Sequence, residues 1–237
     1  MFNLTNRFLS LALVAIASFS SSVLTACSTT TSQNQASNPT TTATDTSDKQ
    51  PMNHDSGMMN HGGGMNHSMT MDLGSADANY DLRFIDAMIP HHQGAVDMAK
   101  QALEKSTRPE IKKLASEIIK AQDQEIAKLK QWRKAWYPSA SSTPVAYDAK
   151  TGKTVSMPHE QMQGMMMNMN LGSADPEFDL RFINAMIPHH ESAIAMAKDA
   201  LSKSQRPEIK KLALSIIDSQ QAEINQMKQW RKTWYNK

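Results

Sequence analysis

The sequence predicts an all-α protein: a four-helix bundle built from two repeated αα-hairpins, with Met- and His-rich irregular segments. Two observations predict it. The segment from Leu73 to Tyr137 returns without a gap from Leu171 to Tyr235, at a constant offset of 98 residues. Within each copy, apolar residues recur every three and four positions, which is the period of an α-helix. One hairpin cannot bury its wide apolar face alone, whereas two can close into a bundle.

The first segment, residues 1–26, is typical of an export signal. A basic Arg7 precedes an apolar run from Phe8 to Phe19, which is too short for a membrane span, and small residues follow. The order Leu-Thr-Ala-Cys ending at Cys27 resembles a bacterial lipobox, so we expect a lipid on this cysteine. Cleavage by an ordinary signal peptidase is the alternative. Both predict a periplasmic or extracellular protein, attached to a membrane only through that lipid.

The next two segments contain no residues for a core. Residues 27–50 are a polar tether rich in Ser, Thr and Asn. Residues 51–72 contain the tripeptide Met-Asn-His three times and no Leu, Ile, Val or aromatic residue.

The composition of the whole chain excludes two other features. The 237-residue chain has 18 Met, one Cys and a net charge of +2. So small a charge gives no electrostatic reason to bind nucleic acid, and a single cysteine excludes an internal disulfide.

The Met- and His-rich segments indicate a soft metal ion. Thioether sulfur is a poor ligand for Mg²⁺ and Ca²⁺ and a weak one for Zn²⁺, whereas Cu(I) accepts Met and His, and Ag(I) is its chemical analogue. Low-complexity filler is the alternative, but filler would not need His and Met together three times. The candidate ligands in these segments are Met52, His54, Met58, Met59, His61, Met65, His67, Met69, Met71, Met157, His159, Met162, Met165, Met166, Met167 and Met169.

The first repeat, residues 73–137, is expected to form two antiparallel helices. Ser75 is placed to cap the first helix, and Pro90 is expected to interrupt and kink it. A short turn then leads to Pro109 at the first position of the second helix, which ends near Tyr137. A turn of this length makes the two helices neighbours.

The second repeat, residues 171–237, predicts the same hairpin. Residues 138–170 join the two repeats, and the sequence VAYDAKTGKTV has the Gly152 turn of a small β-hairpin or an ordered loop. The two helical hairpins close into one bundle within the chain, or they pair between two chains.

Each first helix carries two adjacent histidines. Counting outward from the turn places His91 and His92 level with Gln122, and Met88 level with Glu125. Burying an unpaired amide or carboxylate costs about 1–3 kcal/mol, so these groups are expected to satisfy each other, a water or a metal. We expect the Gln and Glu side chains to orient the imidazoles rather than to bind metal directly. The equivalent residues of the second repeat are Gln220 and Glu223.

Helical spacing also brings sulfur close to the imidazoles. Met88 and His91 are three residues apart, and Met98 lies two turns beyond His91 on the same side, so one soft ion could take both donor types. The alternative is that these Met residues only fill the core and the histidines are hydrogen-bonded core residues. The bundle ligand candidates are Met88, His91, His92, Met98, Met186, His189, His190 and Met196.

The segments AMIPHHQGAVDMAK and AMIPHHESAIAMAK, each preceded by DLRFI, resemble the signature of a bacterial family long catalogued as a domain of unknown function. The resemblance implies a ferritin-like helical bundle. The duplicated arrangement with Met/His-rich leaders is similar to a periplasmic copper-binding protein of cyanobacteria that is implicated in copper resistance. It implies Cu(I) binding outside the cytoplasm at the bundle positions named above.

The predicted function is therefore sequestration of Cu(I), and of Ag(I), which contributes to copper resistance and passes copper to an efflux component. We expect no enzymatic activity. One alternative is a ferritin-like metal oxidase, although the bundle lacks the Glu-x-x-His pairs of a di-iron site. The other is a non-catalytic interaction module that uses exposed Met side chains.

Overall fold

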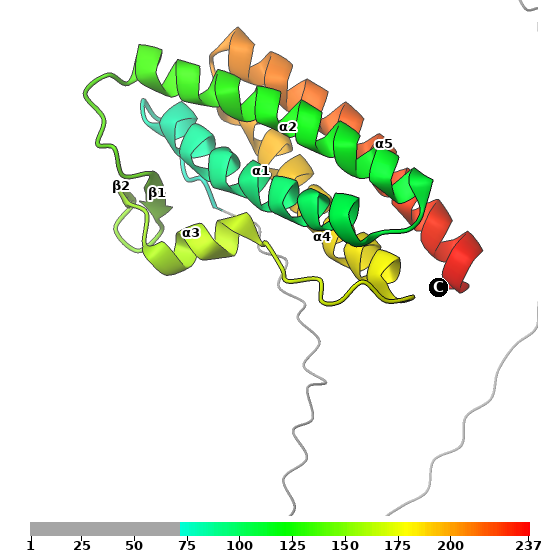
Figure 1. The fold of residues 1–237 in the computed structure, drawn as a ribbon. Coiled ribbons are helices and arrows are strands. Elements are labelled where there is room, and N and C mark those ends of the chain that lie inside the picture. The colour runs from blue at the N-terminus through cyan, green and yellow to red at the C-terminus, as the bar shows by residue number, and fades with distance from the viewer. Residues whose placement is uncertain (1–71) are drawn as a thin grey trace, which may run out of the picture. The chain divides into compact units, whose positions relative to one another are not determined.

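The computed structural model describes residues 72–237, and this part of the chain is mostly helical, as predicted (Figure 1). The export signal, the tether and the leader of residues 51–71 lie outside the described residues. No helix within residues 72–237 is long and apolar enough to cross a membrane. The elements are α1 (Tyr80–Lys105), α2 (Pro109–Trp136), β1 (Val145–Asp148), β2 (Lys153–Ser156), α3 (His159–Met166), α4 (Phe178–Lys203) and α5 (Pro207–Tyr235).

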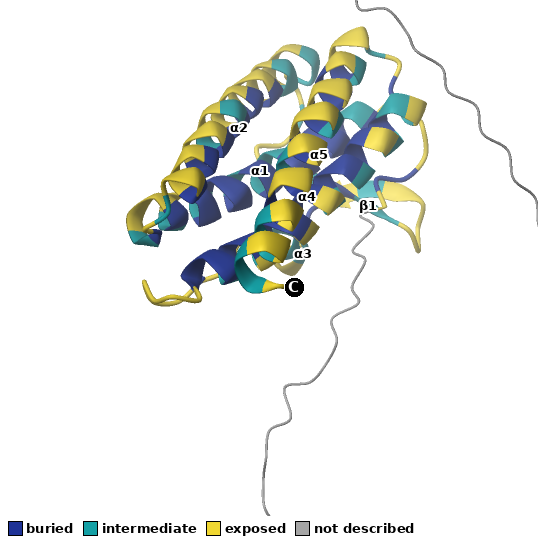
Figure 2. Ribbon diagram, turned by 90° about the vertical axis from the view of Figure 1, so that its right-hand side faces the viewer, coloured by how far each residue is buried: buried dark blue, intermediate teal, exposed yellow. Residues whose placement is uncertain are grey.

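The long helices pack in two pairs. α1 lies along α2 and α4 lies along α5, and the pairs join mainly through α1 against α4 (Figure 1). α2 and α5 each bury one stripe and expose their outer faces, whereas α1 and α4 are buried along most of their length (Figure 2). One apolar cluster joins the first half of α1 to the second half of α4, and another joins the second half of α1 to the first half of α4. The two central helices therefore run in opposite directions.

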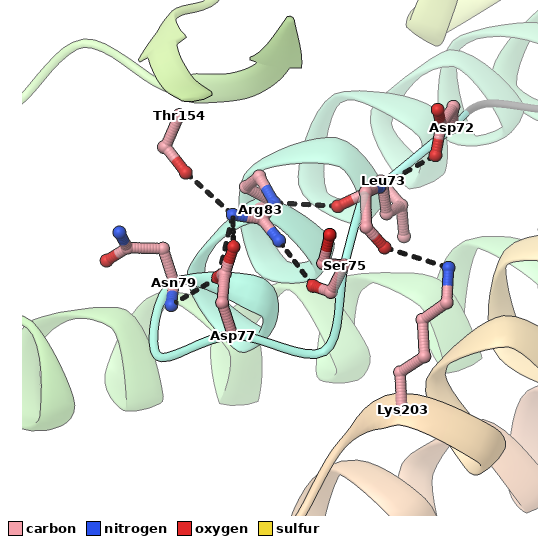
Figure 3. Close-up of polar contacts among 9 residues, drawn as sticks. Asp72, Leu73, Ser75, Asp77, Asn79, Arg83, Thr154 and Lys203 are labelled. Atoms are coloured by element: carbon pink, nitrogen blue, oxygen red, sulfur yellow. Dashed lines mark hydrogen bonds and ion pairs between the residues drawn. The ribbon is translucent and has the colours of Figure 1, made fainter. Parts of the chain in front are cut away.

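The start of α1 differs from the prediction, because Ser75 does not cap it. The residue before the helix is Asn79, and its side chain makes no cap hydrogen bond. The buried Arg83 organises this segment instead (Figure 3): it donates to the carbonyls of Leu73 at 2.6 Å and Ser75 at 2.7 Å, and to Thr154 Oγ1 at 2.6 Å. A charged guanidinium satisfies several acceptors at once, so the backbone before α1 folds around it rather than into a simple cap.

Pro90 does not interrupt α1, which continues as one helix from Tyr80 to Lys105. Pro188 lies inside α4 in the same way. A proline inside a helix removes one backbone hydrogen bond, and here the close packing of each helix against its neighbours is sufficient to keep it continuous. Pro109 begins α2 as predicted, and α2 ends at Trp136, one residue before Tyr137.

The linker between the repeats contains more structure than expected. β1 and β2 form the antiparallel hairpin predicted around Gly152, whose φ of +68° suits a turn. The Met-rich stretch that follows was expected to be irregular, but it forms α3, which packs along α1. Met157 and Met165 are buried there, with 4% and 1% of their surfaces exposed, so burial of their side chains accounts for the ordering.

Candidate metal site

Four histidines meet where α1 crosses α4, between the two apolar clusters. The rings of His91 and His189 lie 3.9 Å apart between centroids, at an interplanar angle of 48°. His92 lies 6.4 Å from His91, and His190 lies 6.2 Å from His189, between the same points. No more than 1% of any of the four is exposed. The structure thus brings both predicted His pairs into a single buried cluster.

Helical geometry explains why the two histidines of a pair contact different helices. Consecutive residues of an α-helix point about 100° apart, so the first histidine of each pair faces the opposite repeat and the second faces its own hairpin partner. His190 Nε2 donates to Glu223 Oε2 of α5 at 2.6 Å. His92 Nε2 lies 2.9 Å from Glu125 Oε2 of α2, but it is out of line for a hydrogen bond.

The glutamines behave differently from the glutamates. Gln122 and Gln220 are buried, each 2% exposed, yet their side-chain oxygens have no hydrogen-bond partner among the described residues. The sequence placed Gln122 level with the His pair and Glu125 one turn further along. In the structure, the glutamate is the residue that contacts an imidazole, because the long helices are staggered by about one turn relative to that count.

The Nε2 atoms of His91 and His189, the first histidine of each pair, have partners that the sequence did not predict. His189 Nε2 donates to the carbonyl of Met166, at the end of α3, at 3.2 Å. His91 Nε2 lies 2.6 Å from Ser192 Oγ of α4. The two repeats differ here, because Ser192 stands where the first repeat has Gly94. That difference between otherwise similar segments was the only sequence signal for this contact.

The Nδ1 atoms of the four histidines have no partner among residues 72–237. The Nδ1 atoms of all four histidines are buried without a hydrogen bond to any residue that the structure describes. A carbonyl and a carboxylate accept hydrogen bonds but donate none, so the ring protons of His189 and His190 are on Nε2, and their Nδ1 lone pairs are bare. An unsatisfied buried polar atom costs about 1–3 kcal/mol. A metal ion would satisfy these nitrogens.

The environment keeps the first histidines neutral. Burial, together with the neighbouring imidazoles, lowers the pKa of His189 to about 3. The same causes lower the pKa of His91 well below its ordinary value of 6.5. A metal binds only unprotonated imidazole, so both rings are in their ligating form at neutral pH.

The predicted sulfur ligands of the bundle flank this cluster. Met88 and Met196 lie in one apolar cluster and Met98 and Met186 in the other, and no more than 3% of any of them is exposed. Each side of the histidines therefore has two thioethers in the adjoining core. Their surroundings are apolar, so packing alone accounts for their burial.

The linker residues are spread from the core to the surface. Met157 and Met165 are buried, Met162 and Met166 are half-buried, and Met169 is 57% exposed. Met167 is half-buried, and its sulfur lies 3.6 Å from Ser192 Oγ, whose hydroxyl donates to the His189 carbonyl at 2.9 Å.

The other predicted ligands lie away from this cluster or beyond the description. His159 is exposed and lies 3.1 Å from Gln163. The structure does not describe Met52, His54, Met58, Met59, His61, Met65, His67, Met69 and Met71.

The described residues contain no ready-made site of three His, Cys, Asp or Glu ligands. Between Asp72 and Lys237, no three such side chains are arranged to hold one ion, and this includes the four clustered histidines. The available donors are imidazole nitrogen and thioether sulfur, which suit a soft ion of low coordination number better than Mg²⁺ or Ca²⁺.

Comparisons with known proteins agree with this chemistry. A sequence model of the family described as "Domain of unknown function (DUF305)" matches residues 81–231. The solved structure of CopM in the Cu(I)-bound form is 41% identical, covering 65% of this chain and 97% of that one, with a TM-score of 0.52. CopM in the Cu(II)-bound form is 42% identical over the same shares, with a TM-score of 0.53. CopM soaked with silver is 39% identical over the same shares, with a TM-score of 0.52.

One curated relative matches a shorter stretch. Uncharacterized protein L153 of Acanthamoeba polyphaga mimivirus is 51% identical over 49 residues, which are 21% of this chain and 32% of that protein. The match spans about a third of the length of this relative.

The family model and the CopM structures confirm the resemblance that the sequence predicted.

Proposed function

This chain belongs to the DUF305 family, and we propose that it is a copper-binding protein that holds Cu(I), or Ag(I) as its analogue, through histidine and methionine side chains. The observation that carries the proposal is the set of four buried Nδ1 atoms, where α1 crosses α4, that have no partner among the described residues. The similarity to CopM, solved in Cu(I)-, Cu(II)- and silver-bound forms, supports it.

The second His pair is the better prepared of the two for metal. Met166 and Glu223 hold the protons of His189 and His190 on Nε2, so both Nδ1 atoms offer a lone pair without losing a proton. An anionic hydrogen-bond acceptor on the outer nitrogen raises the basicity of a ligating imidazole and fixes its orientation. Glu223 has this role at His190, and we assign Glu125 the same role at His92.

The Met-rich segments extend the binding capacity. Neutral thioethers exchange one at a time, so many such ligands suit buffering and transfer better than permanent retention. We propose that the leader of residues 51–71 and the linker methionines take up copper and that the buried histidines retain it. The export-signal sequence and Cys27 support the further proposal that this activity is in the periplasm or outside the cell, where it contributes to copper resistance and delivers copper to an efflux component. The proposal assigns no catalysis.

An anaerobic Cu(I) titration of the protein against a chromophoric chelator tests the proposal, with Zn²⁺ and Fe²⁺ measured in parallel. We expect several Cu(I) ions per chain and little of the other metals. His189→Ala with His190→Ala should remove the tightest class of bound Cu(I). The control is His159→Ala, which changes an exposed histidine outside the cluster. Weak Cu(I) binding beside stoichiometric Zn²⁺ or Fe²⁺ would overturn the proposal.

A further inference from the structure

The buried histidines are closed to solvent, so an ion reaches them only where their covering opens. His91 and His189 are each 1% exposed. Their outer edges are covered by the Met166 carbonyl, at 3.2 Å from His189 Nε2, and by the Ser192 hydroxyl, at 2.6 Å from His91 Nε2. The Met166 carbonyl is at the C-terminal end of α3, and Ser192 belongs to α4. The covering over the contact between the two repeats is therefore one turn of the linker and one hydroxyl.

The linker is fastened on both sides of this turn. Before it, Met157 and Met165 are buried against the bundle. After it, Gln101 of α1 donates to the Met169 carbonyl at 2.8 Å and accepts from the Leu171 amide at 3.0 Å. Between these attachments, the covering turn at Met166 and Met167 is held at a fixed place on the histidine cluster.

The contact with α1 requires glycine. A Cβ atom on Gly94 would lie 1.7 Å from the Met166 carbonyl oxygen, far inside van der Waals contact. The absence of a side chain at this position lets the turn approach α1 closely enough for its carbonyl to reach His189.

Met167 connects this covering to the outside. It is a half-buried, non-glycine residue with φ of +45°, a left-handed conformation that costs free energy for a side-chain-bearing residue. Its sulfur lies 3.6 Å from Ser192 Oγ, which lies 2.6 Å from His91 Nε2. A soft sulfur donor, a hydroxyl and an imidazole thus follow one another from the half-exposed surface to the buried cluster.

Given the copper binding proposed above, we infer that the Met166–Met167 turn is the port through which a soft monovalent ion reaches the histidines, with the Met167 thioether as its first ligand and the Ser192 hydroxyl as the group that moves aside. The step is a ligand exchange. The sulfur–metal bond breaks as a bond forms to a bare imidazole Nδ1 lone pair, the ion keeps its charge, and His189 and His190 keep their Nε2 protons. No oxidant or reductant takes part.

The test is the rate of copper loading. Full-length wild-type protein, Met167→Leu and Asn168→Leu are mixed anaerobically with Cu(I) bound to a chromophoric chelator, and the release of the chelator is followed by stopped flow. In Met167→Leu, leucine keeps the size of the side chain but removes the sulfur. Asn168→Leu is the control, because Asn168 is the exposed neighbour of Met167 and has no sulfur to lose. Circular dichroism verifies that all three proteins are equally folded.

We expect Met167→Leu to load roughly tenfold more slowly than the wild type, which is the lower end of the effect of losing a group that supports a metal site. The final number of bound Cu(I) ions should differ from that of the wild type by no more than one per chain. Asn168→Leu should load at the wild-type rate. Loading of Met167→Leu at the wild-type rate would overturn the inference, and so would an equal slowing in Asn168→Leu. A wild-type protein that binds no Cu(I) at equilibrium would instead refute the proposed function, which separates the two failures.

A second readout uses silver without chelator. Protein labelled with ¹³C at the methionine methyl groups is titrated with less than one equivalent of Ag(I). The Met167 resonance should broaden or shift at the lowest silver additions, as expected for an ion that visits the port before it settles. An unchanged Met167 resonance while the histidine signals respond would contradict the assigned port.

Discussion

The rings of His91 and His189 contact each other at a tilt of 48°, with centroids 3.9 Å apart, although they are equivalent residues of two repeats separated by 98 positions. Equivalent residues meet in this way because α1 and α4 run in opposite directions and cross at the level of the histidines. The duplication therefore creates one cluster of four imidazoles where a single repeat has only two. The site belongs to the contact between the repeats.

Glu223→Gln should weaken copper retention at the second His pair. The substitution replaces a carboxylate that accepts from His190 Nε2 at 2.6 Å with a neutral amide, so the imidazole becomes a poorer donor and is held less firmly. Losses of this kind reduce metal affinity roughly 10–100-fold. Competition with a chelator of known affinity measures it. Glu191→Gln is the control, because that exposed carboxylate pairs with Lys228 on the surface, and an equal loss there would contradict the role of Glu223.

The metal-free protein should lose stability as the pH falls from 6.5 toward 3. The pKa of His189 is about 3 in the folded protein and near 6.5 when unfolded, so in this window the unfolded state binds a proton that the folded state does not. The free energy of unfolding then decreases by up to about 1.4 kcal/mol per pH unit for each such histidine. Urea denaturation at pH 7, 6, 5 and 4 measures the slope.

A matched pair of variants attributes this slope to the buried ring. His189→Gln should give a shallower pH dependence than the wild type, because its side chain does not titrate. His159→Gln, which changes an exposed histidine, should leave the slope unchanged. Identical slopes in all three proteins would contradict the assignment.

Gly94→Ala should detach α3 from α1. The new Cβ would lie 1.7 Å from the Met166 carbonyl oxygen, and a backbone atom cannot move aside as a flexible side chain can. Overpacking of this kind costs about 1–3 kcal/mol. Denaturant unfolding measures the loss, and hydrogen exchange over residues 157–169 should increase.

Ser192→Ala provides the comparison at the equivalent position of α4. It removes the hydroxyl beside His91 Nε2 but adds no volume against the Met166 carbonyl, so hydrogen exchange in α3 should increase less than in Gly94→Ala. Equal stability of wild type and Gly94→Ala, with unchanged exchange in α3, would show that the linker does not pack on α1 as described.

Deleting residues 51–71 should lower the number of Cu(I) ions bound and leave the helical content of the bundle unchanged. These residues contain nine Met and His side chains but no other apolar residue for a core, so the fold should not depend on them. Chelator competition gives the number of ions, and circular dichroism gives the helicity. A loss of helical signal on deletion would contradict the division into leader and bundle.

The sequence predicted the helical content, the first residue of α2 and the turn at Gly152, because periodicity, proline and glycine act locally. It was wrong about Ser75 and about the interruption at Pro90. In both places contacts outside the local sequence outweighed the local preference. Arg83 donates hydrogen bonds to the Leu73 and Ser75 carbonyls before α1. Close packing of the central helices keeps α1 continuous at Pro90. The ordering of α3 was missed because Met-rich polar sequence has little helical signal until it is buried.

For the site, the sequence by itself determined the donors: two His pairs, the methionines around them and the glutamates on the partner helices. Residue type and helical spacing are sufficient for that. Only the tertiary structure decided that His91 meets His189, that Met166 and Ser192 cover them, and that four Nδ1 atoms have no partner within residues 72–237. Those facts depend on how two helices cross and where a linker docks, and the free energy of such contacts comes from residues that are distant in sequence.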